Sequence, residues 1–170
     1  MRSATAILGS PFSGSSSEKI VSLILDRLSP DHWTSTVVDL SEVPADNLLL
    51  RSEGPALRQA LDKTTEADLI IPASPTYRAT YTGLLKVFFD LMPPESLLGS
   101  YVLPVQTGGS PHHSLSIEYG MVPMVRSLGG LVLANSIYTW SDHWNEDGSA
   151  GEDLVSMIES SVSEISLLLK

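Results

Sequence analysis

Short apolar runs and amphipathic segments alternate five times along the chain, and this alternation limits the possible folds more than any other feature of the sequence. The apolar runs predict β-strands, and they cover residues 5–8, 36–40, 69–73, 101–105 and 131–138. The segments that follow them predict helices, and they cover about 20–28, 56–64, 84–92, 115–128 and 154–169. Strands and helices in alternation predict an α/β fold, in which a parallel sheet has helices on both faces.

The number of strands decides between two arrangements of such a sheet. Five strands favour a flavodoxin-like three-layer sandwich with strand order 2-1-3-4-5, whose cleft at the carboxyl ends of the strands takes FMN. A six-stranded dinucleotide-binding sheet needs a further strand and helix, for which 170 residues leave no room. Because neither a linker nor an internal repeat interrupts the pattern, we expect residues 1–170 to form a single flavodoxin-like domain.

Composition and charge exclude several classes of function. The net charge of −10 disfavours DNA and RNA as partners, because phosphate backbones are bound by clusters of Lys and Arg. A small phosphorylated ligand is still compatible with this charge, since neutral hydroxyls and backbone amides can hold it. No apolar run approaches the ~20 residues that a membrane-spanning helix needs, so we expect no membrane association.

The residue types that carry metal and thiol chemistry are absent or scattered. The chain contains no cysteine, which removes disulfides, thiolate nucleophiles and cysteine-based metal sites and fits a cytoplasmic protein. We expect no metal site from the histidines either, because His112 and His113 are adjacent and diverge, while His32 and His143 lie in other segments.

Three loops that follow strands one, three and four should meet at the carboxyl edge of the sheet. The first, 10–17, is rich in serine and opens a helix, so its hydroxyls and amides suit a phosphate group. The second, Ser74-Pro75-Thr76-Tyr77, offers a hydroxyl and an aromatic ring to a flat ligand. In the third, Thr107-Gly108-Gly109-Ser110, the glycines let the backbone approach a ligand closely. Together the loops suit a phosphate, a flat ring system and its polar edge, which describes FMN.

Each loop also has an ordinary interpretation when it is taken alone. The serine run can be a polar loop with a helix N-cap, and the other two loops can be simple turns. The first loop has neither the Gly-Lys-Ser/Thr of a Walker A loop nor the Gly-x-Gly-x-x-Gly of a dinucleotide site. The prediction of a site therefore depends on the coincidence of the three loops.

The same residues show a resemblance to a known family. Over residues 5–138 the chain is similar to the NADPH-dependent FMN reductases, in particular to the flavin reductases of sulfonate-utilising two-component monooxygenases. The resemblance is carried by Gly9-Ser10-Pro11 with Ser15 and Ser17, by 74–77 with 81–86, and by 103–110 with His113. It implies an oxidoreductase that reduces free FMN with NADPH and supplies the reduced flavin to a partner monooxygenase.

The resemblance also implies roles for individual residues. The implied flavin contacts are Ser10, Ser15, Ser16 and Ser17 at the phosphate, Pro75, Thr76, Tyr77 and Arg78 at the ribityl chain and isoalloxazine, and Thr107, Gly108, Gly109 and Ser110 at the pyrimidine side. No side chain is expected to be catalytic, because the hydride passes directly from nicotinamide to flavin.

One tyrosine has a distinct implied role. In the sulfonate-linked reductases, a tyrosine matching Tyr119 in Ile117-Glu118-Tyr119-Gly120 is an insertion that forms a π-turn at a subunit interface near the flavin. Such turns often mark functional sites. The resemblance implies that Tyr119 controls the release of flavin as a product, and the alternative is an ordinary interface or core tyrosine.

The family pattern also implies a homodimer or homotetramer. We expect its interface around residues 84–92 and 115–128, with an exposed apolar face formed by Leu84, Leu85, Phe88 and Phe89. Two departures from the family pattern concern the ligands. The segment 139–148 is shorter than its counterpart in relatives, and it lacks a basic cluster for the 2′-phosphate of NADPH. The rings of Trp33, Trp140 and Trp144 are expected to be packing or loop anchors.

Two other functions stay open. A flavodoxin-like electron carrier would hold FMN permanently, although its phosphate loop usually alternates threonine and glycine. A related reductase that retains FMN and acts on quinones, azo dyes or metal oxyanions shares the first two loops. Tyr119 is therefore the main feature that separates this second alternative from a flavin reductase.

Overall fold

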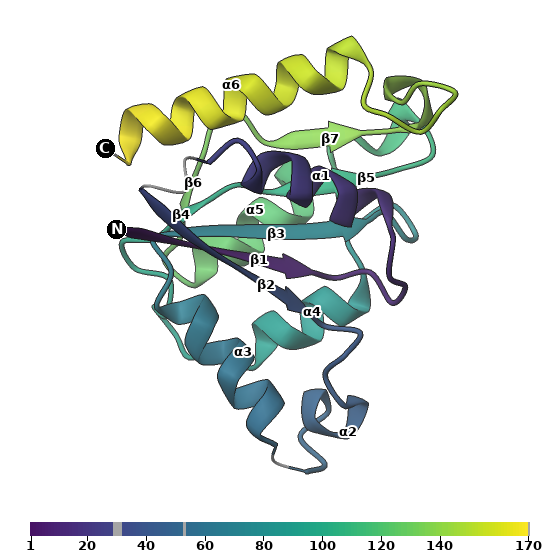
Figure 1. Cartoon of the computed structure of the whole chain (residues 1–170). Helices are drawn as coiled ribbons and strands as arrows, with labels where there is room; N and C mark the ends of the chain where they lie inside the picture. The colour runs from purple at the N-terminus through teal and green to yellow at the C-terminus, as the bar shows by residue number, and fades with distance from the viewer. Residues whose placement is uncertain (29–31, 53, 170) are drawn as a thin grey trace.

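The computed structural model describes residues 1–28, 32–52 and 54–169 of the chain (Figure 1). The strands are β1 Arg2–Leu8, β2 Trp33–Asp39, β3 Leu69–Pro75, β4 Tyr101–Val102, β5 Val105–Thr107, β6 Leu131–Val132 and β7 Ile137–Thr139. The α-helices are α1 Ser16–Leu25, α2 Ala45–Leu48, α3 Pro55–Thr65, α4 Gly83–Asp90, α5 Val122–Ser127 and α6 Glu152–Leu168. Each predicted strand and helix overlaps an observed one.

All strand pairs are parallel. The predicted order 2-1-3-4-5 is confirmed when the divided fourth and fifth strands are each counted as one. β1 lies between β2 and β3, β3 pairs with both β4 and β5, and these pair with β6 and β7. The prediction of five continuous strands is wrong, because the fourth and fifth are each divided and the described residues form seven strands. The fourth breaks at Pro104, which has no amide N–H for the ladder.

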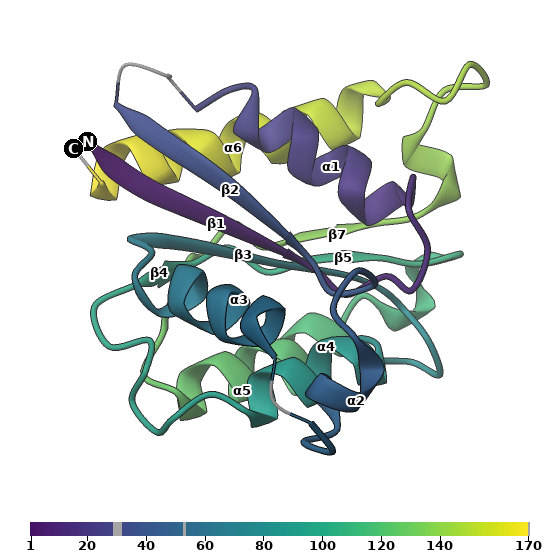
Figure 2. The ribbon, with the colours of Figure 1, turned by 60° about the horizontal axis from the view of Figure 1, so that its bottom comes forward.

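Helices cover both faces of the sheet, as predicted (Figure 2). α1 and α6 lie on one face, and α3, α4 and α5 lie on the other. Alternate residues of β3 serve the two layers: Leu69 and Ile71 pack in the cluster of α1 and α6, whereas Ile70 packs with α4. Burial on both faces fits the continuous apolar run at residues 69–73 of this strand.

The expected exposed apolar face of α4 is wrong. Leu85 and Phe88 are fully buried and Phe89 is 2% exposed, because they pack into the core between the sheet, α3 and α5. The two phenylalanine rings meet edge to face, with their centroids 5.8 Å apart. Leu84 is partly buried against the same cluster. The apolar face of α4 therefore belongs to the core of this chain.

The chain enters α5 through a π-helical turn, Ile117–Met121. This confirms the π-turn that the resemblance implied at Tyr119. The tyrosine lies at the middle of the turn and is 81% exposed. Gly120 faces inward, and a Cβ placed on it would lie 2.8 Å from the Thr80 Oγ1. The π-turn therefore packs against the segment that follows β3.

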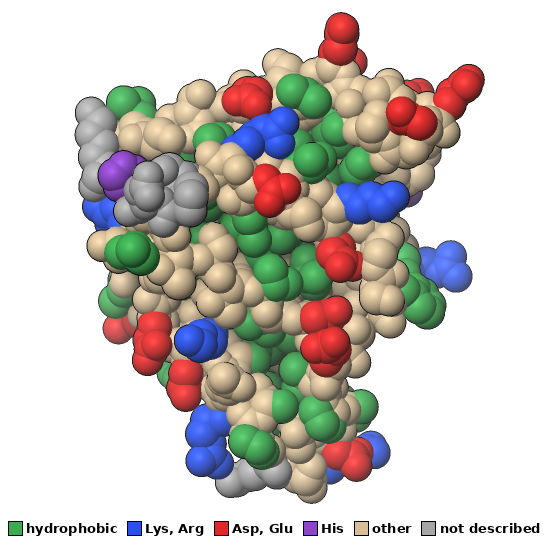
Figure 3. Space-filling view, in the orientation of Figure 1, with side chains coloured by type: hydrophobic (Ala, Val, Ile, Leu, Met, Phe, Trp, Pro, Cys, Tyr) green, Lys and Arg blue, Asp and Glu red, His purple; other side chains and the backbone are tan. Residues whose placement is uncertain are grey.

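On the face shown in Figure 3, single Lys and Arg side chains are interspersed with Asp and Glu. In the part of the chain that the structure describes, no helix is long and apolar enough to cross a bilayer.

Candidate functional site

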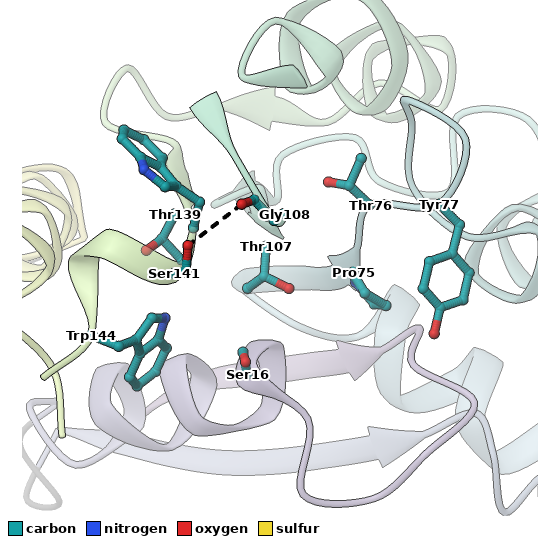
Figure 4. Close-up of a pocket in the computed structure, with 11 residues that line it drawn as sticks. Ser16, Pro75, Thr76, Tyr77, Thr107, Gly108, Thr139, Ser141 and Trp144 are labelled. Atoms are coloured by element: carbon teal, nitrogen blue, oxygen red, sulfur yellow. Dashed lines mark hydrogen bonds between the residues drawn. The ribbon is translucent and has the colours of Figure 1, made fainter. Parts of the chain in front are cut away.

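A pocket opens at the carboxyl ends of β3, β5 and β7, beside the N-terminus of α1 (Figure 4). Its volume of about 350 Å³ lies in the range of small-molecule sites, about 300–1,000 Å³. Its wall is formed by Ser16, Pro75, Thr76, Tyr77, Thr107, Gly108, Gly109, Thr139, Trp140, Ser141 and Trp144. The three predicted loops therefore meet, and a fourth segment, which follows β7, joins them.

The serine loop presents Ser16 to the pocket and uses its other hydroxyls for its own structure. Ser15 is the N-cap of α1: its Oγ accepts from the Glu18 N–H at 3.2 Å and lies 3.1 Å from the Oγ of the buried Ser17. The Ser10 Oγ donates to a carbonyl two residues on, at 2.9 Å. Ser16 is the first helical residue, where backbone amides have no intrahelical acceptor.

Buried hydroxyls tie the first loop to the second. The Thr82 Oγ1 donates to the Gly9 carbonyl at 2.6 Å and accepts from the Leu85 N–H at 3.1 Å, which caps α4. The Ser74 Oγ accepts from the Thr82 N–H at 2.9 Å and donates to the Pro75 carbonyl at 2.8 Å. These bonds hold both loops in one arrangement at the pocket.

The aromatic turn after β3 is a tight two-residue hairpin. The Tyr77 N–H donates to the Thr80 carbonyl at 2.8 Å, and the Thr80 N–H donates back at 3.3 Å. Between them, Arg78 and Ala79 have φ angles of +52° and +68°, a conformation that favours Asn and Gly. Non-glycine residues in this region are strained, and such strain is concentrated at functional sites. The turn places Tyr77 on the pocket wall and leaves Arg78 exposed.

The glycine loop is held from behind by Tyr138 and Thr139. The Gly108 N–H donates to the Thr139 carbonyl at 2.8 Å, so this amide is used within the protein. The Tyr138 Oη donates to the Ser110 carbonyl at 3.0 Å. A Cβ on Gly108 would lie 2.1 Å from the Tyr138 Oη, whereas nothing lies within 4 Å of the equivalent point on Gly109. Gly108 therefore permits close packing, and Gly109 borders open space.

The structure divides the residues that were predicted to bind flavin into two groups. Those on the pocket wall are Ser16, Pro75, Thr76, Tyr77, Thr107, Gly108 and Gly109. Those set back from the wall are Ser10, Ser15, Ser17, Arg78 and Ser110. In the second group, the serines form hydrogen bonds that shape the loops, and Arg78 belongs to the strained turn.

The segment after β7 reaches the pocket, although none of the three loops predicted to form the site includes it. Thr139 ends β7, and Trp140, Ser141 and Trp144 follow it on the pocket wall. The Trp144 ring has the Lys19 Nζ 5.9 Å from its centroid, and the Trp140 ring lies 3.8 Å from the His143 ring between centroids. The topology could have pointed to this segment, because the loop after the fifth strand lies at the same edge of a parallel sheet as the other three loops.

A second cavity, a groove of about 490 Å³, lies between α4 and α5 and borders Tyr119. Burial raises the pKa of the Tyr81 phenol in this groove; Lys86 opposes the shift and Asp90 adds to it. The phenol is therefore protonated at neutral pH. Across the described ranges, no three His, Cys, Asp or Glu side chains gather at a point that could hold a metal ion.

The donors of the first pocket fit a flavin nucleotide. Ser16 and the first amides of α1 suit a phosphate without a charged side chain. The hydroxyls of Thr76 and Thr107, together with the open space at Gly109, suit the polar edge of a flat ring. The strand order and the position of the pocket are those of flavodoxin-like proteins, whose FMN cleft lies at this edge. The fold and the site therefore define a flavodoxin-like protein.

Comparison with known proteins narrows this class to a family. The chain belongs to the NADPH-dependent FMN reductase family, whose model matches residues 3–145. An FMN reductase (NADPH) of Escherichia coli (strain K12) is 36% identical over 95 residues, which cover 56% of this chain and 50% of that protein. The chain spans about half the length of the curated relatives it matches.

Solved structures agree with the fold. The apo crystal structure of an NADH:FMN oxidoreductase (EMOB) superposes with a TM-score of 0.86 at 31% identity, covering 99% of this chain and 90% of that one. A flavodoxin of Streptococcus pneumonia TIGR4 superposes with a TM-score of 0.63 at 18% identity, covering 98% and 99% of the two chains. The second likeness concerns the fold alone.

Proposed function

We propose that this chain binds FMN in the pocket at the carboxyl edge of the sheet, reduces it with NAD(P)H, and releases reduced flavin for a partner monooxygenase. The observation that carries this proposal is the meeting of a helix N-terminus, two threonine hydroxyls, an aromatic turn and a glycine loop on one open pocket. Related proteins are named for both coenzymes, NADPH in one case and NADH in another. The monooxygenase partner is inferred from the resemblance to sulfonate-linked reductases, and a cytoplasmic location is proposed because the sequence contains no cysteine.

In this proposal the chain positions two ligands. Ser16 and the amides of α1 hold the phosphate of FMN, Thr76 and Tyr77 contact the ring system, and Thr107 with its glycine loop borders the pyrimidine side. Bound FMN supplies the acceptor for the hydride of the reduced nicotinamide. The protein orients the rings, and because the hydride passes directly between them the pocket needs no acid–base pair.

We also propose that the chain forms a homodimer or homotetramer beside Tyr119. The ring of Tyr119 borders the groove between α4 and α5 and is 81% exposed. Leu115, whose carbonyl accepts from the Tyr119 N–H, is 60% exposed. Because α4 buries its phenylalanines inside this chain, the contact would use the outer edge of α4 and the π-turn. Analytical ultracentrifugation measures the mass of the assembly directly.

Coenzyme oxidation tests the proposed reaction. We expect the purified protein to be largely colourless and to oxidise NADPH or NADH at a significant rate only when FMN is added. A tightly bound yellow flavin with turnover of quinones, and none of free FMN, would support a flavin-retaining reductase instead. A chain that binds FMN but oxidises neither coenzyme with any acceptor would support an electron carrier.

Replacing Tyr119 by alanine tests the role of the π-turn in flavin release. We expect a larger fraction of the purified Tyr119→Ala chains to carry FMN, because Gly120 of the same turn lies against Thr80, which closes the hairpin proposed to contact the flavin. Absorbance of the purified protein measures this fraction. Leu167→Ala truncates an exposed leucine of α6, on the opposite face of the sheet from the π-turn; it serves as the control and should stay colourless. A colourless Tyr119→Ala protein would argue against the role in release.

A further inference from the structure

A fully buried amide lies directly behind the pocket wall. Gln106 is in β5, one residue before the pocket residue Thr107, and has no exposed surface. Its Nε2 donates to the Thr76 Oγ1 at 2.9 Å. Its Oε1 is also buried and has no hydrogen-bond partner among the residues that the structure describes. Because an unpaired buried acceptor costs stability, the fold alone gives no reason for glutamine at this position.

The hydrogen bonds of Thr76 leave one donor for a ligand. Its backbone N–H donates to the Thr107 carbonyl at 2.6 Å. A threonine hydroxyl has one proton and two lone pairs, and Gln106 already occupies a lone pair. No described residue accepts the hydroxyl proton. Since Thr76 lies on the pocket wall, with its Oγ1 3.5 Å from where a Cβ on Gly108 would be, this proton is available to a ligand there.

We propose that Gln106 is a positioning residue that directs the Thr76 hydroxyl into the pocket, where it donates to a carbonyl oxygen or unprotonated ring nitrogen of the flavin. Gln106 does not reach the ligand, because the threonine lies between the amide and the pocket. The unpaired oxygen of the buried glutamine lowers the stability of the fold, while its amide fixes the Thr76 hydroxyl as a donor. Residues at binding sites commonly lower stability in this way. This inference rests on the proposed binding of FMN.

A double-mutant cycle tests this arrangement through FMN affinity, measured by quenching of flavin fluorescence. We expect Thr76→Val and Gln106→Met each to weaken FMN binding about tenfold, the loss of one good hydrogen bond. The double variant should also lose about tenfold rather than a hundredfold, because Gln106 acts through Thr76. The affinity for riboflavin should fall by the same factor, since the proposed Thr76 donor faces the ring system and not the phosphate.

Stability without ligand separates a positioning role from a structural one. Gln106→Met should keep or raise the thermal midpoint, because it removes the unpaired buried oxygen. Gln106→Leu gives a second apolar replacement if the methionine variant folds poorly. Thr64→Val is the matched control: it removes a fully buried hydroxyl that bonds within α3, and it should not change FMN affinity.

The outcomes distinguish this inference from the function on which it rests. If the wild-type chain binds no FMN, the proposed function fails and the inference fails with it. If the wild type binds FMN but the losses of the two variants multiply, or Gln106→Met binds as the wild type does, the inference alone is overturned. A Gln106→Met protein that loses stability and affinity together would show that the amide supports the fold.

Discussion

Gly108→Ala is expected to destabilise the chain by about 1–3 kcal/mol and to lower FMN affinity at least about a hundredfold. The new Cβ would lie 2.1 Å from the Tyr138 Oη and 2.9 Å from its Cζ, and the tyrosine is 8% exposed, so its ring has little room to move. The glycine loop must shift instead, which breaks the bond from the Gly108 N–H to Thr139 and misplaces the Thr107 side of the pocket. Chemical denaturation and flavin titration measure the two effects.

The neighbouring glycine provides a control for this prediction. Gly109→Ala adds the same methyl group one residue further on, into open space, and should leave stability nearly unchanged. Adding Tyr138→Phe to Gly108→Ala removes the nearest clashing atom and should restore part of the stability, after allowance for the lost bond to Ser110. Wild-type stability and affinity in Gly108→Ala would show that the loop is more adaptable than its packing indicates.

Ser16→Asp should weaken FMN binding about a hundredfold while leaving riboflavin binding unchanged. Ser16 is the first residue of α1 and lies on the pocket wall, where we propose that the phosphate binds. Two unit charges about 5 Å apart at an effective dielectric constant near 20 repel by about 3 kcal/mol, which corresponds to about a hundredfold in affinity. An acidic residue in the first turn of a helix is favourable for the fold, so lost binding would not reflect unfolding.

Riboflavin and an uncharged variant make this test specific. Riboflavin lacks the phosphate, and Ser16→Asn has nearly the shape of the aspartate without its charge, so the charge effect should disappear in both cases. Equal losses for FMN and riboflavin would mean that Ser16 contacts another part of the flavin. If Ser16→Asp weakens the binding of neither FMN nor riboflavin, the phosphate lies away from α1.

The arrangement of the three loops could be predicted because it depends on local patterns and on topology. The apolar run at 69–73 predicts a strand buried on both faces, and the residues after it lie at the carboxyl edge in any parallel sheet. The same reasoning assigned Thr76, Tyr77 and Thr107 to one site, and the structure places all three on the pocket wall. The resemblance to a family added the π-turn at Tyr119, which periodicity could not show.

Other features could not be predicted because they depend on which side chains meet across the fold. Periodicity predicted that Phe88 and Phe89 lie in a helix with an apolar face, but it could not predict whether that face packs on this chain's core or on a second subunit. The serine run could not reveal that Ser17 is buried and that Ser16 faces the pocket. Trp140 and Trp144 carried no motif, and they reach the wall through the loop after β7.

The sequence by itself determined the order of strands and helices, the edge of the sheet that carries the site and the absence of thiol chemistry, because each follows from residue type and spacing along the chain. The tertiary structure decided which hydroxyls face the pocket and which residues support them. Gln106 and Thr76 are 30 residues apart, and the pairing of β3 with β5 brings them within 2.9 Å. A hydrogen bond depends on such distances and directions, which chain separation does not specify.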